Sequence, residues 1–427
     1  MREDLLQFIW KYKKLYWQDL VTTWDETLDI LDPGSHNQQS GPDFFNAKIK
    51  IDGQLWAGNV EVHSNASDWY AHHHEKDSSY DNVILHVVWH DDIDVYRKDK
   101  TRIPTLELKK YVPVELLKNY RYLFDNRSTK FINCESDISK VDAFALKNWL
   151  ERLYIERLEQ KSVMVNALLK DSNNDWEKVL FMLLLKNFGL NINGASFFGI
   201  AQALDFSIVR KLQKDPLRLE SVLFGLAGLL DRDDTKDAYF EVLKKEYTYL
   251  QQKFGLNQER VPQPEFFKLR PTNFPTIRLS QIVSVYERHP NLFQKVMNTQ
   301  SLDGLYTIFD IAASRYWDNH FTFGKESKKR IKKLTKPFID LLIINTILPL
   351  KFCYARHRGV DCMEEICAII DKIKKEDNVI LKKFKAFGVN VKSAGDSQAI
   401  LQLYKGYCLK NKCLQCAIGS SLLHGNI

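Results

Sequence analysis

Two carboxylates and an imidazole in the N-terminal part of the chain have the spacing of a metal site. Asp43 opens one stretch of strand-like sequence, and Glu61 and His63 lie two positions apart in a second stretch. Because side chains alternate across a β-strand, Glu61 and His63 are expected to project from the same face. Carboxylate oxygens suit Mg²⁺, and an added imidazole favours Mn²⁺. The pattern predicts that these three side chains converge on one divalent cation, with His36 and His86 as further candidate ligands.

The other histidines near this segment each have two interpretations. The run His72–His74 falls in a short helical pattern, where the commoner role is a solvated helix face. The alternative is that one of the three ligates a metal. His86 lies in an apolar strand pattern. It is therefore either a core histidine bonded to backbone or a residue that supports the metal site from behind.

Hydrophobic patterning predicts the elements that must position this site. Residues 45–51 alternate as a half-buried strand that ends in an Asp-Gly turn, and residues 56–63 are the expected partner strand. Residues 83–89 are almost continuously apolar, which is typical of a central strand buried on both faces. The remaining expected elements are a helix at about 3–17, a strand at 28–31, a short helix at about 68–75 and a strand at 103–108. Together they predict a compact α/β domain over residues 1–140, a mixed sheet flanked by helices.

Helical periodicity dominates from about residue 141 onwards. The expected helices are Ala145–Leu168, Trp176–Phe188, Phe197–Ala203, Arg218–Leu230, Asp237–Phe254, Ser280–Tyr286, Phe338–Pro349 and Met363–Lys375. We therefore expect an α+β fold in which residues 141–427 form a mostly helical domain. The Pro-rich stretch Val261–Pro275 could divide this domain into two subdomains.

Three cysteines near the C-terminus have the spacing of a second metal site. Cys408, Cys413 and Cys416 offer three thiolates within nine residues, which suits a structural Zn²⁺ or an iron–sulfur cluster. Either would need a fourth ligand, and the candidates are Cys353, Cys362, Cys367 and His424. The expected role is to fasten the C-terminal tail to the helical domain. The alternative is three half-buried structural thiols in a reducing compartment.

Composition limits the class of protein. The chain has 427 residues, 44% of them hydrophobic and 12% aromatic, as in a folded protein of more than one domain. No apolar run approaches the roughly 20 residues that span a bilayer, and the N-terminus lacks the apolar centre of a signal peptide. We expect a cytoplasmic protein with no membrane partner. The net charge of +7 and the basic run Lys325–Lys336 permit an acidic partner such as nucleic acid, although such a run is more often a solvated face.

The site and its surroundings resemble the PD-(D/E)XK nuclease superfamily. In that superfamily a helix–three strands–helix–strand core carries an acidic residue after Pro on its second strand and Glu-x-Lys on its third. Pro42-Asp43 and Glu61-Val62-His63 match this pattern, with His63 in place of the lysine. The resemblance implies Mg²⁺- or Mn²⁺-dependent hydrolysis of phosphodiester bonds in DNA or RNA. Asp43 and Glu61 would hold the cation, and His63 would ligate it or position the attacking water.

Longer strings resemble a bacterial family filed as domain of unknown function 2851. They are the opening LLQFIWKYKKL, the segment from Gly41 to Asp92, and the later segments Leu269–Ile282 and Tyr407–Gly419. This resemblance covers nearly the whole chain and implies a bacterial cytosolic setting. It carries no established activity.

Three hypotheses of function follow from these patterns. The first is a metal-dependent nuclease-like enzyme that uses Asp43, Glu61 and His63. The second is a non-catalytic scaffold that binds nucleic acid or another protein through a degenerate nuclease fold, which the absent lysine and the large helical region favour. The third is metal-dependent hydrolysis of a small phosphorylated or carbonyl substrate, for which a deep closed pocket is expected.

Overall fold

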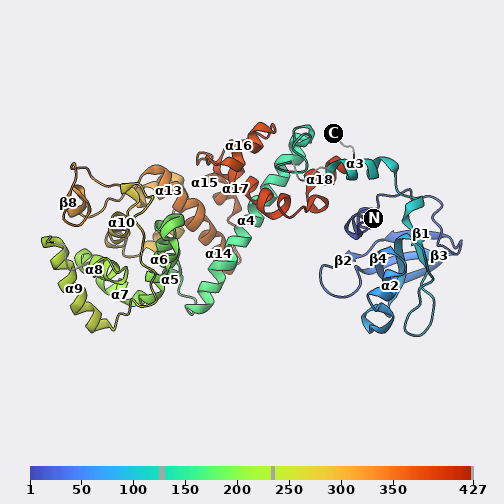
Figure 1. The fold of residues 1–427 in the computed structure, drawn as a ribbon, viewed down its shortest axis with the longest axis horizontal. Coiled ribbons are helices and arrows are strands. Elements are labelled where there is room, and N and C mark those ends of the chain that lie inside the picture. Colours follow the sequence, from blue (N-terminus) through green and yellow to red (C-terminus); the bar gives the residue numbers. More distant parts are fainter. Residues whose placement is uncertain (125–129, 232–235, 425–427) are drawn as a thin grey trace. The chain divides into compact units, whose positions relative to one another are not determined.

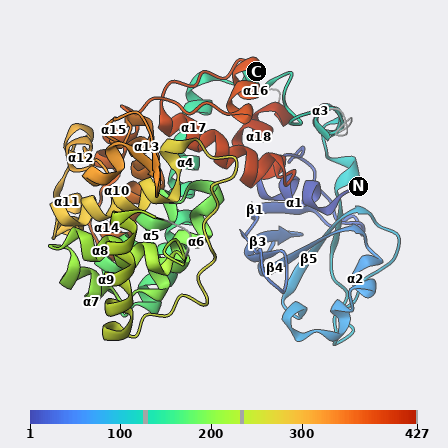
Figure 2. The same ribbon diagram turned by 60° about the vertical axis from the view of Figure 1, so that its left-hand side comes forward.

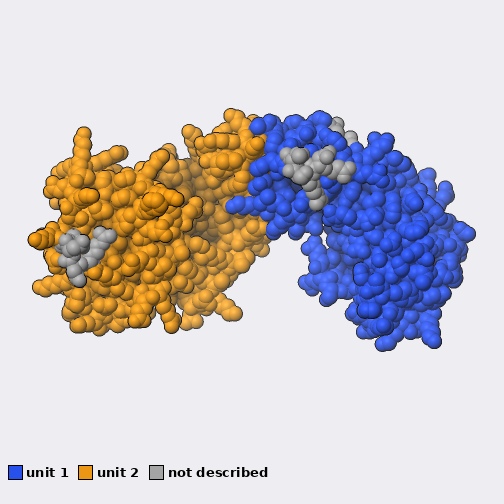
Figure 3. Space-filling model, viewed as in Figure 1, with its two compact units in different colours: residues 1–149, 386–389, 403–427 blue, residues 150–385, 390–402 orange. Residues whose placement is uncertain are grey.

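The computed structural model describes residues 1–124, 130–231 and 236–424. These residues form two compact units (Figure 3). Unit 1 consists of residues 1–149, 386–389 and 403–427, and unit 2 of residues 150–385 and 390–402. Unit 1 is a mixed sheet with helices and unit 2 is mostly helical (Figure 1), so the expected α+β fold is confirmed. That residues 1–140 form a domain of their own stays a prediction.

Unit 1 is built on a curled, mixed sheet in the order β1-β3-β4-β5-β6, with the short β2 paired to β3 (Figure 2). The strands are β1 (Leu28–Asp32), β2 (Ser35–His36), β3 (Phe44–Ile51), β4 (Gln54–Asn65), β5 (Val83–His90) and β6 (Thr105–Glu107). β1, β3 and β4 pair antiparallel, and the β3–β4 hairpin closes at the expected Asp-Gly turn. β4, β5 and β6 run parallel, and α2 (Asp68–Ala71) lies in the connection from β4 to β5.

Two apolar clusters cover the two faces of this sheet. On one face, α1 (Glu3–Lys11) buries Leu6 and Trp10 in a cluster with Val60 and Val62 of β4. On the other face, Trp69 of α2 is fully buried in a smaller cluster that includes residues of β5. The expected helix at 3–17 is shorter than its pattern. It ends at Lys11 because Lys13 takes a left-handed conformation, with φ 51°.

The C-terminal segment returns to the sheet of unit 1. α3 (Val114–Phe124) comes after the sheet in the sequence, and α18 (Ala417–Leu423) packs against α3. Leu414 and Leu423 belong to the same apolar cluster as α1. Leu414 and Leu423 therefore share the core of α1, about 400 positions earlier in sequence.

Unit 2 consists of helices with one small hairpin (Figure 1). α4 (Ala143–Asp171) contributes residues to both units. The other elements are α5 (Trp176–Phe188), α6 (Leu190–Ala203), α7 (Phe206–Leu212), α8 (Pro216–Leu226), α9 (Ala238–Phe254), α10 (Pro275–Arg288), α11 (Leu292–Asn298), α12 (Leu302–Ile308), β7 (His320–Thr322), β8 (Lys325–Glu326), α13 (Lys336–Leu342), α14 (Leu348–His357), α15 (Met363–Ile370), α16 (Val379–Ala386) and α17 (Ala394–Gln402).

One continuous helix among the described residues is long and apolar enough to cross a membrane. It spans Lys336–His357 and joins α13 to α14 through a π-helical turn at Ile343–Ile347. Of its most apolar window, 72% is buried inside the protein, as in the central helix of a helical core. The pair α6 and α7 meets the same criterion only if both helices, bent by 85°, are counted as one span.

Candidate metal centre

Strand β4 presents Glu61 and His63 on the face that α2 covers. The neighbouring Val60 and Val62 point the other way, into the cluster under α1. The alternation expected from the sequence is therefore present in the structure. Both side chains are buried, with 5% of Glu61 and 2% of His63 exposed. A carboxylate and an imidazole buried side by side in a central strand need partners that compensate for lost water.

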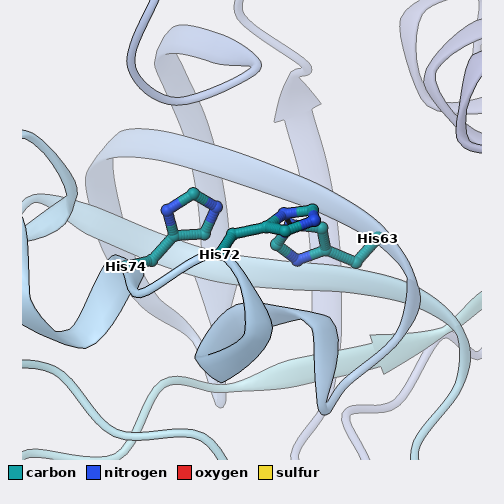
Figure 4. A group of neighbouring side chains, drawn as sticks. All are labelled: His63, His72 and His74. Carbon is teal, nitrogen blue, oxygen red and sulfur yellow. Dashed lines mark hydrogen bonds between the residues drawn. The ribbon is translucent and has the colours of Figure 1, made fainter.

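Two further histidines come to this face from the turn after α2. His73 has a left-handed backbone conformation, φ 61°, which reverses the chain between His72 and His74 and directs both toward β4. Figure 4 shows the imidazoles of His63, His72 and His74 gathered in front of the sheet, and one ring nitrogen from each lies within 4.8 Å of the others. His63 is buried, His74 is half-buried and His72 is exposed, so the group opens to solvent beside His72.

Glu61 lies against two of these imidazoles and is the candidate fourth ligand. Its Oε1 lies 3.5 Å from Nε2 of His63 and 3.4 Å from Nε2 of His74. Nε2 of His63 also lies 3.2 Å from Nδ1 of His72. The buried Nε2 of His74 makes no hydrogen bond among the described residues. A divalent cation at this point would satisfy it, because neutral imidazole nitrogens and a carboxylate oxygen are ordinary ligands of transition metals.

His86 of β5 fixes the orientation of the His63 ring. Nδ1 of His63 lies 2.8 Å from Nε2 of His86, and His86 is fully buried. For Nε2 of His63 to face a metal with its lone pair, Nδ1 must carry the proton and donate it to His86. Such a partner behind a ligating histidine sets its tautomer and raises its basicity. Of the two interpretations of His86, the structure favours the supporting residue.

Asp43 lies beside Glu61 at the start of β3. Its backbone N–H donates to Oε2 of Glu61 at 3.0 Å. Its own carboxylate accepts two hydrogen bonds, from Nε2 of Gln7 on α1 at 2.8 Å and from the backbone N–H of Val62 at 3.2 Å. Asp43, Glu61 and His63 therefore do meet in space. Asp43 is held beside the ligand set by Gln7, a residue that no sequence pattern singled out.

Burial makes the two carboxylates costly to ionise. It raises the pKa of Glu61 to about 8. Burial, followed by the charge of Glu61, raises the pKa of Asp43 to about 7. The imidazoles are held neutral, since burial and the neighbouring rings lower the pKa of His63 to about 2 and that of His86 to about 3. The neutral imidazole of His63 and the buried carboxylates of Glu61 and Asp43 are groups that a divalent metal would stabilise.

The remaining candidate ligands lie elsewhere. His36 stacks on Phe44, with ring centroids 5.0 Å apart, and belongs to no group of three ligand atoms within the described residues. Cys408, Cys413 and Cys416 lie in unit 1 and line one hollow together with Cys134. The residues proposed as a fourth ligand to these cysteines do not line it: Cys353, Cys362 and Cys367 belong to unit 2, and His424 faces Phe8.

Sequence reasoning underweighted His72 and His74 and missed Cys134. The signal for the two histidines was the triplet itself, because two ligands at i and i+2 can share one face if the residue between them turns the chain. Cys134 carried no such signal, since no other cysteine lies within 200 residues of it in the sequence.

The comparisons with known proteins give a family and no function. No curated protein and no solved structure matches the chain. One family model matches residues 3–379, a range that includes the metal centre and most of unit 2. The chain belongs to the family described as "Protein of unknown function (DUF2851)".

Proposed function

We propose that this protein is a divalent-metal-dependent hydrolase that cleaves phosphodiester bonds in nucleic acid. The observation that carries the proposal is the group of His63, His72 and His74, with the carboxylates of Glu61 and Asp43 beside it. A bound divalent cation lowers the pKa of a water and neutralises charge on a phosphate oxygen, which is the chemistry of phosphodiester hydrolysis. Three imidazoles favour Mn²⁺ over Mg²⁺ at this site.

The order of elements supports a nuclease-like core. α1, β1, β3, β4, α2 and β5 follow one another as in the PD-(D/E)XK superfamily, with Asp43 at the start of the second long strand of the antiparallel set and Glu61 on the third. His63 occupies the place of the lysine. Within the centre, Gln7 and Val62 orient Asp43, and His86 holds the proton on Nδ1 of His63.

Exposed aromatic and basic residues after α1 support nucleic acid as the substrate. Tyr12, Tyr16 and Trp17 are 46%, 61% and 45% exposed. Nζ of Lys11 lies 5.4 Å from the Tyr12 ring centroid, and Lys11 is one helical turn from Gln7, which holds Asp43. Exposed rings beside lysines are what single-stranded nucleic acid uses for stacking and phosphate contact.

Cleavage assays with labelled single- and double-stranded DNA and RNA in Mn²⁺ or Mg²⁺ test the proposal. We expect Mn²⁺-dependent cleavage by the wild type, loss of cleavage in Glu61→Gln and His74→Ala, and unchanged cleavage in His73→Asn. His73 is the matched control because it lies in the same triplet and is outside the ligand set, and because asparagine tolerates its left-handed backbone. Circular dichroism checks that all variants are folded. Equal cleavage by wild type and His74→Ala would reject this centre.

The second candidate is a non-catalytic nucleic-acid-binding scaffold. The observation that favours it is His63 itself, because its imidazole stays neutral in the fold and cannot replace the positive charge of a lysine. Salt-dependent binding of the same probes without turnover in either metal would select this function.

A further inference from the structure

Four thiols from distant parts of the sequence meet in unit 1. Cys408, Cys413 and Cys416 come from the C-terminal segment, and Cys134 comes from the connection between α3 and α4. All four line one hollow. Burial, followed by the neighbouring Cys413 and Cys416, raises the pKa of the thiols of Cys134 and Cys408. All seven cysteines of the chain are in the thiol form, so the four are not paired as disulfides.

The spacing of the sulfurs distinguishes between two kinds of metal centre. In a tetrahedral zinc site with four thiolates, the Sγ atoms lie about 3.8 Å apart. Here no three of the four Sγ atoms, all in described residues, lie within 4.8 Å of one another. A four-iron cluster holds its cysteine sulfurs roughly 6 Å apart around its own iron and sulfide. A spacing wider than that of a zinc site therefore favours a cluster over a single zinc ion.

The surroundings of the hollow also suit an iron–sulfur cluster. Nδ2 of Asn133 donates to Sγ of Cys413 at 3.4 Å. Hydrogen bonds to the sulfurs and an apolar shell tune such clusters and exclude water from them. Leu123, Leu403 and Ile418 supply apolar side chains to the wall, which Tyr407 and Gly419 also line.

The chain is built closely around this hollow. A Cβ atom at Gly419 would lie 2.2 Å from the carbonyl oxygen of Cys413, so the turn that joins Cys413 to Cys416 and α18 requires glycine at this position. The backbone at Gly419 lies so close to the backbone of Cys413 that a residue with a Cβ atom would not fit.

We propose that Cys134, Cys408, Cys413 and Cys416 bind a [4Fe–4S] cluster. The cluster ties residues 403–427 to the connection after α3, and so closes the C-terminal segment onto the sheet that carries the metal centre. This inference is independent of the hydrolase proposal, because it uses none of the residues of that centre. In the fold the cluster would act as a crosslink between Cys134 and the three cysteines of the C-terminal segment.

Anaerobic purification of the full chain tests this inference. The measurements are the visible absorbance spectrum and the iron, acid-labile sulfide and zinc content. We expect a brown protein with about four iron and four sulfide per chain. Cys134→Ser should lose this iron, and Cys367→Ser should keep it. Cys367 is the matched control because it is a half-buried thiol of unit 2 outside the hollow.

Reconstitution keeps the inference falsifiable if Cys134→Ser folds poorly. Wild type, Cys134→Ser and Cys367→Ser are each incubated anaerobically with ferrous iron and sulfide, and in parallel with Zn²⁺. Cluster formation in wild type and Cys367→Ser alone supports the inference. A colourless wild type that takes up one zinc and no cluster would overturn it, as would a wild type that takes up no metal or a cluster that persists in folded Cys134→Ser.

Discussion

Glu61→Gln should make the metal-free protein more stable while abolishing its response to metal. Among the described residues the buried carboxylate of Glu61 is paired only with histidines, and its pKa is raised from 4.5 to about 8. The variant removes the charge but keeps the shape. Its amide oxygen can still accept the N–H of Asp43, and its amide nitrogen can donate to Nε2 of His74, which otherwise makes no hydrogen bond among the described residues.

The size of the effect follows from the pKa difference between the folded and unfolded states. At pH 7 Glu61 is ionised in the unfolded state, whereas burial disfavours its ionised form in the folded state. This difference lowers the wild type's free energy of unfolding by about 3 kcal/mol. Glu61→Gln should recover most of this in a chelator. A metal at 1,000 times its dissociation constant should reverse the order, because it stabilises the wild type by about 4.1 kcal/mol and the variant by nothing.

Urea unfolding in chelator and in Mn²⁺ measures both parts of the prediction. The matched control is Glu115→Gln on α3, where the same charge is removed from a side chain that is 76% exposed, and no change beyond a few tenths of a kcal/mol is expected. The reasoning is refuted if Glu61→Gln is less stable than the wild type without metal. It is also refuted if metal stabilises both proteins equally.

Three further predictions follow from the same geometry. His86→Leu should weaken metal binding about 10- to 100-fold by removing the acceptor behind His63, whereas His86→Gln should keep most of the affinity, and metal titration followed by calorimetry would show the difference. Gly58→Ala should destabilise the protein by about 1–3 kcal/mol in urea unfolding, since its Cβ would lie 2.4 Å from Cγ2 of Ile84; stability equal to wild type would contradict this packing. The stability advantage of Glu61→Gln without metal should depend on pH. As pH rises, Glu61 loses its proton in the unfolded state before it does so in the folded state, because folding raises its pKa. The advantage should therefore be absent below about pH 4.5, grow by about 1.4 kcal/mol per pH unit up to pH 8 and then level off. A difference in stability that does not change with pH would show that Glu61 is not the group responsible.

The strands and the meeting of Glu61 with His63 could be predicted because their signals are local. Alternation along β4 fixes which side chains share a face, and the apolar run of β5 marks a central strand. The Asp-Gly turn fixes the register between β3 and β4. These features depend on residues a few positions apart, so the sequence carries them directly.

The rest of the site depends on contacts that sequence spacing does not encode. His74 reaches Glu61 because His73 takes a left-handed conformation, which is uncommon for any residue other than glycine and cannot be read from spacing. Gln7 reaches Asp43 only once α1 packs on the sheet. Cys134 joins the C-terminal cysteines only when residues 403–427 return to unit 1, a long-range pairing that periodicity cannot indicate.

The most direct test of the metal centre is Mn²⁺ binding by equilibrium dialysis of the metal-free protein, with wild type beside His74→Ala and the control His73→Asn. The account predicts about one tightly bound Mn²⁺ per chain in wild type and in His73→Asn, and its loss in folded His74→Ala. A wild type that binds no Mn²⁺, or a His74→Ala variant that binds it as tightly as wild type, would contradict the account.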